Sequence, residues 1–275
     1  MPSNSRPIGP EAAVTDVLWD RLGPVIVVDA PGQLIEPLLR GNQGTGTDQL
    51  RLLSTERALR QGLRDFSLAS QAAELIETGR LKVRSADDLP GPPIVVTDSR
   101  VIRFVSLGEE VYLLETDDTG FVAAAYDHFT EVWAAGAEYS VREPPLTTVR
   151  TRFEETFGPE GLEEFDAMLG SPQGDGIDVV SRLVLLAARH GELLYDIGTW
   201  GEDVGIASRA TFSRRKARLE RAGVLTTEPV HREKGRPRQR LLLADDRFQK
   251  APIEDLLRIA IDYVNGNFRG AQIPA

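Results

Sequence analysis

Basic side chains gather in one short stretch of this chain, ASRATFSRRKARLERAG, which spans residues 207–223. Six of its seventeen residues are arginine or lysine, and only one is acidic. From Ile206 to Arg240 there are eleven Lys/Arg and three Asp/Glu, a local charge of +8 in a chain of net charge −10, so the rest carries −18. Guanidinium groups bind phosphates and guanine edges, which makes this region a candidate nucleic-acid contact. The competing interpretation is a solvated basic helix face.

The spacing of the stretch predicts a helix from about Ser208 to Ala222. Ser208 is a suitable N-cap residue, and Gly223 is a suitable stop after the last turn. At about 100° per residue, Phe212 and Leu219 fall on one face. The opposite face carries three arginines with small residues between them: Arg214, Arg218 and Arg221, with Ala210 and Ala217. Small residues let a helix approach base edges closely, so this face is the predicted reading face.

The segments around this helix change how the arginine face is interpreted. Asp196–Val204 is predicted to be a short amphipathic helix, and VGIAS supplies a tight glycine turn into the next helix. Two predicted strands, VLTTEPV and RQRLLLA, then flank the basic segment HREKGRP. This order is that of a winged helix-turn-helix, in which the second helix reads the major groove. A helical domain with an unrelated hairpin is the alternative.

The predicted DNA-contacting residues lie on the reading helix and on the hairpin that follows it. They are Arg209, Thr211, Ser213, Arg214, Arg215, Arg218, Arg221, Arg232, Lys234, Arg236 and Arg238. Thr211 and Ser213 are expected to donate to phosphate, and Arg214 or Arg218 to pair with guanine. The hairpin residues are expected to contact the backbone or the minor groove. Charged residues also protect hairpin edges from aggregation, and both roles are compatible.

The first half of the chain alternates predicted strands and helices, which indicates an α/β unit over residues 24–139. Predicted strands cover residues 25–29, 50–54, 81–85, 94–98, 101–107 and 110–117, and predicted helices include residues 14–22, 56–65, 68–78 and 120–139. The expected domains are an α/β sensor or dimerisation domain (1–143), a helical connector (144–176), a winged helix-turn-helix (177–245) and a C-terminal amphipathic helix with a tail (246–275).

Small-molecule sites are weakly marked in this sequence. Asp29 and Asp98 are the predicted effector-binding residues; Asp29 follows a buried strand, where open α/β sheets bind ligands. Asp29 is equally suited to capping the next helix, and Asp98 to a hairpin turn. The loop GNQGTGTDQ lacks the Lys-Ser/Thr of a phosphate-binding loop. With no cysteine and three dispersed histidines, no metal or cofactor is predicted, although a carboxylate-only metal site stays open.

Composition bounds the setting in which the protein works. No apolar run approaches the roughly 18 residues of a membrane span, and the first residues lack a signal-peptide core, so a cytoplasmic location is predicted. The chain is acidic and holds only four lysines, which suits a salt-adapted cytoplasm. A GC-rich genome that favours arginine codons is the alternative explanation.

Two segments of the sequence resemble known transcriptional regulators. GTWGEDVGIASRATFSRRKARLERAGVLTTEPV, followed by GRPRQRLLL, is similar to the C-terminal winged helix of haloarchaeal TbsP-type regulators, which are related in function to TrmB-type regulators. The similarity is densest from Ile177 to Leu243. Lys216 departs from the apolar residue common there in winged helices, which predicts a more open flank. YLLETDD, GFVAAAYDHF and EVW resemble the end of the phospholipase-D-like sensor domain of TrmB-like regulators.

The resemblance implies a regulator of transcription rather than an enzyme. It implies sequence-specific binding to double-stranded DNA, a response to a metabolite, and target genes in central carbon metabolism (glycolysis and gluconeogenesis). The catalytic motif of phospholipases is absent, since His128 is not followed by a lysine two residues on. A homodimer is expected because dimers read two half-sites. Two alternatives stay open: an enzyme with an α/β nucleotide- or phosphodiester-binding domain and a DNA-binding tail, and an architectural or partner-binding protein.

Overall fold

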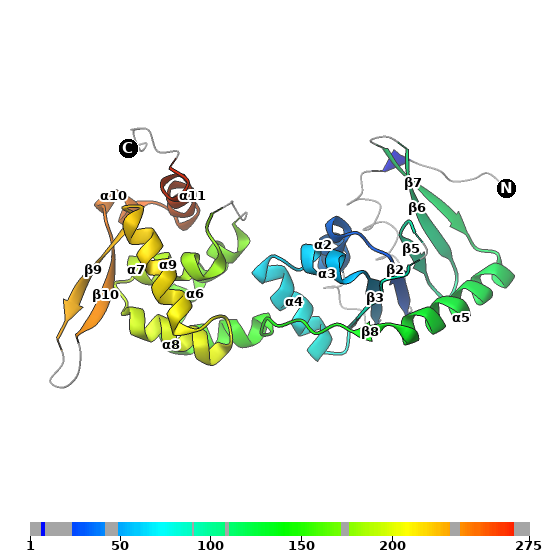
Figure 1. Cartoon of the computed structure of the whole chain (residues 1–275), viewed down its shortest axis with the longest axis horizontal. Coiled ribbons are helices and arrows are strands. Elements are labelled where there is room, and N and C mark those ends of the chain that lie inside the picture. The colour runs from blue at the N-terminus through cyan, green and yellow to red at the C-terminus, as the bar shows by residue number, and fades with distance from the viewer. Residues whose placement is uncertain are drawn as a thin grey trace. The chain divides into compact units, whose positions relative to one another are not determined.

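The chain consists of two compact units, Met1–Pro145 and Leu146–Ala275, each with a hydrophobic core of its own (Figure 1). The computed structural model describes residues 7–8, 24–41, 49–89, 91–107, 110–171, 176–231 and 237–266. The helix expected over residues 14–22 and most of the loop GNQGTGTDQ lie outside the described residues. Each unit is therefore considered by itself.

The described residues of the first unit form an eight-stranded mixed sheet in the order β1-β7-β6-β5-β2-β3-β4-β8. Its strands are β1 (Pro7–Ile8), β2 (Val25–Val28), β3 (Leu50–Ser54), β4 (Leu81–Ser85), β5 (Ile94–Val96), β6 (Val101–Leu107), β7 (Glu110–Thr116) and β8 (Ala137–Glu138). Strands β2, β3 and β4 are parallel because helices connect them, whereas tight turns make β5, β6 and β7 antiparallel.

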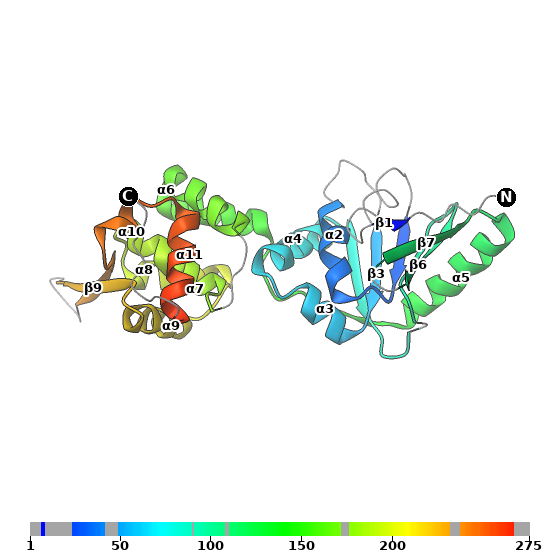
Figure 2. The ribbon, with the colours of Figure 1, turned by 90° about the horizontal axis from the view of Figure 1, so that it is seen from above.

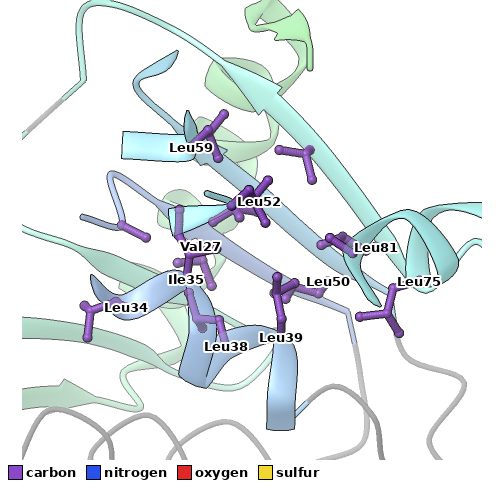
Figure 3. Packing of buried hydrophobic residues seen from close by; sticks show 14 of the residues in the cluster. Val27, Leu34, Ile35, Leu38, Leu39, Leu50, Leu52, Leu59, Leu75 and Leu81 are labelled. Atoms are coloured by element: carbon purple, nitrogen blue, oxygen red, sulfur yellow. The ribbon is translucent and has the colours of Figure 1, made fainter. Parts of the chain in front are cut away.

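The two faces of this sheet are covered by different helices, as the alternation of side chains along β2 requires. Val27 points into a cluster with α2 (Gly32–Gly41), α3 (Glu56–Gly62) and α4 (Phe66–Glu77), which Figure 3 shows from close by. Ile26 and Val28 point to the other face, against α5 (Thr119–Ala135). Figure 2 shows the sheet between these two sets of helices. The α/β character expected from the sequence is confirmed.

Helix α5 ends at Ala135, which corrects the expectation of a helix to residue 139. Arg84 of β4 donates to the carbonyls of Trp133 and Ala134, and these bonds close the last turn. The chain then pairs as β8 with the edge strand β4. A Cβ atom at Gly136 would lie 2.8 Å from the end of the Leu53 side chain, so a larger residue here would have to displace this buried leucine.

The second unit is mainly helical and contains one hairpin. Its elements are α6 (Leu146–Gly170), α7 (Val179–Arg189), α8 (Leu194–Val204), α9 (Arg209–Arg221), β9 (Leu225–Val230), β10 (Arg238–Leu243), α10 (Asp246–Lys250) and α11 (Ile253–Val264). Helix α6 is kinked at Gly158, where φ is 81° and ψ 172°. Phe153 and Phe165, on either side of the kink, pack on Trp200 of α8. Helix α6 is thus part of the core of this unit.

The apolar stripe of helix α11, the amphipathic helix expected near the C-terminus, packs on its own unit. It contacts α6, α7 and α9. The side chains of Ile253, Leu256, Leu257 and Ala260 are buried in these contacts. Because this stripe is covered within the chain, the expected homodimer has to use another surface and stays a prediction.

Candidate nucleic-acid interface

Helices α8 and α9 form a helix-turn-helix in which the two backbones approach closely. Gly205 has a left-handed φ of 90° and ends α8, and the Ile206 N–H donates to the Gly201 carbonyl at 2.8 Å. A Cβ atom at Gly201 would lie only 2.3 Å from the Phe212 ring of α9. The glycine turn expected from VGIAS is confirmed, and Gly201 adds a contact that only glycine allows.

Helix α9 has the boundaries and the buried face that the sequence predicts. The Ser208 side chain caps its start by accepting from the Thr211 N–H, and Gly223, with φ 78°, follows its end. Phe212 and Leu219 are at most 1% exposed, so they anchor the helix to the core. The opposite face therefore lies toward solvent, where Ser213, Arg214 and Arg221 are exposed.

Three of the six cations on α9 are held by carboxylates of the same unit. Arg209 pairs with Glu202 of α8 at 2.8 Å. Arg215 pairs with Asp178, at the start of α7, at 2.6 Å. Lys216 pairs with Glu220 at 2.9 Å. These charges are paired within the fold, and the pairs of Arg209 and Arg215 join α9 to α8 and to the start of α7.

The other three cations, Arg214, Arg218 and Arg221, form the predicted reading face. Arg214 donates to the Thr211 hydroxyl at 2.9 Å, and Arg221 donates to the Ala217 carbonyl at 3.2 Å. Within the described ranges, none of the three has a carboxylate at ion-pair distance. Their charge is thus available to an external polyanion, and sequence spacing and structure single out the same three residues.

Lys216 does not leave an open flank, which corrects the expectation drawn from its polar side chain. The residue is only 8% exposed, and its ammonium group donates to the Glu220 carboxylate. Glu220 also accepts from the Thr227 hydroxyl of β9 at 2.9 Å. Because the lysine brings its own counter-charge one helical turn away, it packs where an apolar residue is common.

The β9–β10 hairpin stands beside α9 and completes the winged arrangement (Figure 1). Its strands pair from Leu225 with Leu243 to Val230 with Arg238. A short bridge between Leu193 and Arg240, with the Leu241 N–H donating to Glu192 at 2.9 Å, attaches the hairpin to the start of α8. The predicted contacts Arg232, Lys234 and Arg236 lie outside the described residues.

Arg238 is engaged within the protein at the base of the hairpin. Its Nη1 donates to the Asp196 carboxylate at 3.0 Å, and its guanidinium lies 3.7 Å from the centre of the Tyr195 ring. Tyr195 is 45% exposed. Tyr195 could not be recognised as a site residue from the sequence, because one aromatic residue in the first turn of a helix shows no periodic pattern.

Asp178 links two helices of this unit through one carboxylate. Its Oδ1 accepts from the Ser181 N–H at the start of α7, and its Oδ2 accepts from Arg215 of α9. Burial alone would raise the pKa of this carboxyl. The hydrogen bonds from Ser181 and the Arg215 charge outweigh burial and lower the pKa below 3.8. The ionised carboxylate is therefore part of the folded unit at neutral pH.

The two predicted effector residues lie at opposite ends of one strand pair. Asp29 follows Val28, which pairs with Ile94 at the start of β5, whereas Asp98 follows the end of β5. The structure does not bring the two carboxylates together. One small ligand therefore cannot contact both.

Asp29 occupies a strained turn after β2. Its φ of 59° is left-handed, and its N–H donates to the Leu53 carbonyl at 2.8 Å. Burial raises the pKa of its carboxyl, and a hydrogen bond from the Gly91 backbone opposes this shift in part. Left-handed residues other than glycine are uncommon, and aspartate is among those that tolerate the conformation.

Asp98 lies in the turn between β5 and β6, which Thr97 closes by accepting from the Arg100 N–H at 2.9 Å. Asp98 and Ser99 line a cavity of about 290 Å³ together with residues from the start of α5. The α5 residues include Thr119, Tyr126 and Asp127. Asp98 is thus a turn residue that also borders a cavity.

The described residues were also considered as metal ligands and as membrane-spanning helices, and His128 belongs to neither group. His128 is exposed on α5, with its ring 4.9 Å from that of Phe129. No described group of three or more His, Asp or Glu side chains is placed to hold a metal ion. No described helix combines the length and apolar character needed to cross a bilayer.

Two family models together match almost the whole chain. Residues 8–144 match the model described as "Transcriptional regulator TbsP-like, N-terminal". Residues 145–261 match "Transcriptional regulator TbsP-like, C-terminal HTH domain". A comparison with curated proteins finds no match.

Solved structures with distant similarity include TrmBL2, Nuc and NucT. TrmBL2, described as an archaeal chromatin protein with a novel mode of DNA binding, is 16% identical over 47% of this chain, with a TM-score of 0.37; the match spans about half (50%) of the TrmBL2 chain. Nuc of Salmonella typhimurium, a phospholipase D family member, is 12% identical over 46% of this chain and 89% of its own, with a TM-score of 0.35. NucT from Helicobacter pylori is 9% identical over 50% of this chain and 99% of its own, with a TM-score of 0.38.

Proposed function

The chain belongs to the TbsP-like transcriptional regulators, and on that basis we propose that it binds a specific sequence of double-stranded DNA through the reading face of α9. The observation that carries this proposal is the sorting of cations on one helix. Arg209, Arg215 and Lys216 are paired inside the unit. Arg214, Arg218 and Arg221 have no carboxylate partner in the described ranges. A helix that carried spare charge for solubility alone would not need this separation.

The chemistry of the reading face fits the major groove. Arginine pairs in a bidentate way with guanine, and each such pair discriminates by about 1–3 kcal/mol. Ala210 and Ala217 are exposed beside the arginines, so the helix backbone can approach the base edges. Ser213 is exposed and able to donate to a phosphate. Arg232, Lys234 and Arg236 of the wing keep their expected role as backbone or minor-groove contacts.

Binding is expected to depend steeply on salt. About six arginine or lysine contacts to phosphate give a log–log slope of affinity against salt near −5. The acidic, lysine-poor composition supports a salt-adapted cytoplasm as the setting, and there much of this electrostatic attraction is lost. Contacts to base edges and DNA shape then have to supply more of the affinity.

A direct test first selects DNA that the full-length protein binds from a random pool, and then compares variants on the selected fragment. Arg214→Ala and Arg218→Ala are expected to weaken binding about 10- to 100-fold each. Arg209→Ala is the matched control on the same helix, because its charge is already neutralised, and it is expected to change affinity less than about threefold. Wild-type affinity in both Arg214→Ala and Arg218→Ala would overturn the assignment of the reading face.

The cavity beside Asp98 supports a neutral ligand as the effector. Two carboxylates, Asp98 and Asp127, border it, together with the hydroxyl side chains of Ser99, Thr119 and Tyr126. Carboxylates repel phosphorylated metabolites, whereas hydroxyl and carboxylate groups both bind polyols. Thermal unfolding with glucose, glycerol and glucose 6-phosphate tests this point. Stabilisation by the neutral compounds that is lost in Asp98→Ala supports the site, and stabilisation by the phosphate alone contradicts it.

The target genes and the assembly are further parts of the proposal. The family resemblance supports genes of central carbon metabolism, and recognition of two half-sites supports a homodimer. A genome-wide binding profile on two carbon sources tests the first, with occupancy expected at genes of glycolysis and gluconeogenesis. Sedimentation of the full chain tests the second, and a monomer at micromolar concentration would contradict it.

A further inference from the structure

Tyr195 is unusual among the aromatic side chains of the second unit because it is 45% exposed. The other large apolar side chains in the described part of this unit are buried or half-buried. Tyr195 is the second residue of α8, beside the base of the β9–β10 hairpin. The ring is therefore accessible to a partner, and a tyrosine offers both an apolar body and a polar hydroxyl for such a contact.

Arg238 holds the Tyr195 ring in place from the other side of the hairpin base. Its guanidinium lies 3.7 Å from the ring centre, and its Nη1 donates to Asp196 at 3.0 Å. The Arg238 side chain is 22% exposed, and that of Asp196 39%. A planar guanidinium fixed at two points restricts the rotamer of the ring that it covers. The three residues, Tyr195, Asp196 and Arg238, form what we call the wing-base bridge.

The wing-base bridge has a satisfied cation and a free phenol. Nη1 of Arg238 is engaged by Asp196 and one face of its guanidinium by the Tyr195 ring, so part of this cation is already used within the protein. The Tyr195 hydroxyl makes no such contact in the described ranges. Its neutral O–H can donate to a phosphate oxygen without breaking the bridge.

The start of α8 offers a second feature that suits an anion. Its N-cap residue is Leu193, whose side chain cannot cap the first backbone N–H groups. Uncapped N–H groups and the helix dipole favour a negative charge at this end. Asp196 lies in the same turn and would oppose an anion, but Arg238 neutralises it.

We propose that Tyr195 donates a hydrogen bond to a backbone phosphate of the bound DNA, and that Arg238 is a positioning residue that, with Asp196, orients the Tyr195 ring. This inference rests on the DNA binding proposed above. A phosphate contact of this kind carries no sequence information. It therefore adds affinity for every DNA sequence and fixes the register of α8 on the duplex.

The first test removes the hydroxyl and keeps the ring. Tyr195→Phe is expected to weaken binding about tenfold on both the selected fragment and an unrelated one, because a hydrogen bond to a charged group is lost. The salt slope should stay unchanged, since the tyrosine releases no counterion. Tyr139→Phe in the first unit is the matched control and should bind as the wild type does. Wild-type affinity in Tyr195→Phe would overturn the proposal.

The second test separates a positioning role of Arg238 from a direct one. If Arg238 positions Tyr195, Arg238→Ala and Asp196→Ala each weaken binding about fivefold, and the double variant is no weaker than either alone. The salt slope is then unchanged. If Arg238 itself binds phosphate, Asp196→Ala tightens binding and Arg238→Ala reduces the slope by about 0.9, and the positioning role is overturned.

Two controls keep this inference distinct from the proposed function. Asp196→Asn keeps the shape of the side chain without its charge, and thermal unfolding of every variant identifies a loss of folding. If Arg214→Ala loses affinity while Tyr195→Phe does not, the phosphate contact proposed for Tyr195 is refuted and the assignment of the reading face stands. If Arg214→Ala, Arg218→Ala and Tyr195→Phe all bind as the wild type does, the proposed function falls as well.

Discussion

The two units of this protein handle charge in different ways. Residues 1–145 hold 13 Lys/Arg and 22 Asp/Glu, a net charge of −9, whereas residues 146–275 hold 19 and 20, a net charge of −1. In the first unit, some exposed arginines pair with nearby acids, as Arg40 does with Glu36 and Arg60 with Glu56, whereas Arg57 and Arg64 are exposed without an ion pair among the described residues. In the second unit, pairing is selective and leaves one face of α9 without counter-charges.

This difference shows that local sorting, more than net charge, creates a surface for a polyanion. The second unit is nearly neutral, so its total charge predicts no attraction to DNA. Its paired cations hold α9 in the fold, and its unpaired cations share one face. Because fields from exposed charges are screened beyond about 10 Å at moderate salt, such a face acts independently of distant acids. A substitution in one unit is therefore expected to leave the properties of the other unit unchanged.

The largest effect is expected from reversing two charges of the reading face. Arg214→Glu with Arg218→Glu removes two base contacts and adds repulsion, so affinity should fall at least about 100-fold. The equal reversal in the first unit, Arg40→Glu with Arg60→Glu, should change affinity less than about threefold. Fluorescence anisotropy with the selected DNA measures both. A large loss of DNA affinity in Arg40→Glu with Arg60→Glu would contradict this prediction, because it would mean that the first unit also contributes to DNA binding.

A second prediction concerns the close approach of α8 and α9. Gly201→Ala places a methyl group about 2.3 Å from the Phe212 ring, and the resulting overpacking should lower the stability of the second unit by about 2–3 kcal/mol. Calorimetry should show the transition of this unit at lower temperature, with that of the first unit unchanged. Gly170→Ala, where nothing lies within 4 Å, is the control. A shift of both transitions would mean that the units unfold together.

A third prediction compares helix caps in the two units. Asp178→Ala should destabilise the second unit by about 1 kcal/mol at pH 7, because α7 loses its N-cap and Arg215 its partner. Since the folded state lowers the pKa of Asp178, its stabilisation is complete above 3.8 and is lost as the pH falls through the folded value. Wild type and variant should therefore converge in strong acid. Asp65→Ala, which removes the N-cap of α4, should act on the first unit alone.

The smallest effect is expected at Asp29. Asn tolerates the left-handed φ of 59° and carries no charge, so Asp29→Asn should stabilise the first unit by less than about 1 kcal/mol at pH 7. Because the folded state raises the pKa of Asp29, the advantage of Asn grows as the pH rises above 3.8 and vanishes below it. Denaturant titrations at pH 3 and pH 7 measure this difference. Destabilisation at pH 7 would indicate that the hydrogen bond from the Gly91 backbone to the carboxylate outweighs the cost of its burial.

The order of elements in the second unit was predictable because its signals are local. Ser208 and Gly223 mark the ends of α9, and Phe212 and Leu219 mark its buried face within two helical turns. The pairing of Arg215 was not predictable, since Asp178 lies 37 residues away and meets it only through the packing of α7 on α9. The sequence grouped Arg214, Arg218 and Arg221 on one face, but it also gave Arg209 and Arg215 as DNA contacts, because the carboxylates that pair with them lie outside α9.

In the first unit, long periodic elements were predictable and short edge elements were not. Strand β2 is an apolar run, β3 is mainly apolar, and apolar and polar residues alternate at the start of β4. Strand β8 has two residues, Ala137 and Glu138, too few for any periodicity, and it forms only because β4 offers a free edge. The separation of Asp29 from Asp98 likewise depends on the antiparallel pairing of β2 with β5, which spacing along the chain does not reveal.

Because helix α11 completes the packing around α9, the DNA-binding unit can be fully formed only after α11 has been synthesised. It contacts α9, and it is the last helix in the described chain. During translation, α9 and the hairpin leave the ribosome first and lack part of their core until residues near Val264 follow. Partly made chains thus expose the surface that α11 later covers, and an incomplete core seldom holds a helix in one orientation. A nascent or prematurely terminated chain therefore contains the arginines of α9 but lacks the packing of α11 that holds this helix in one orientation.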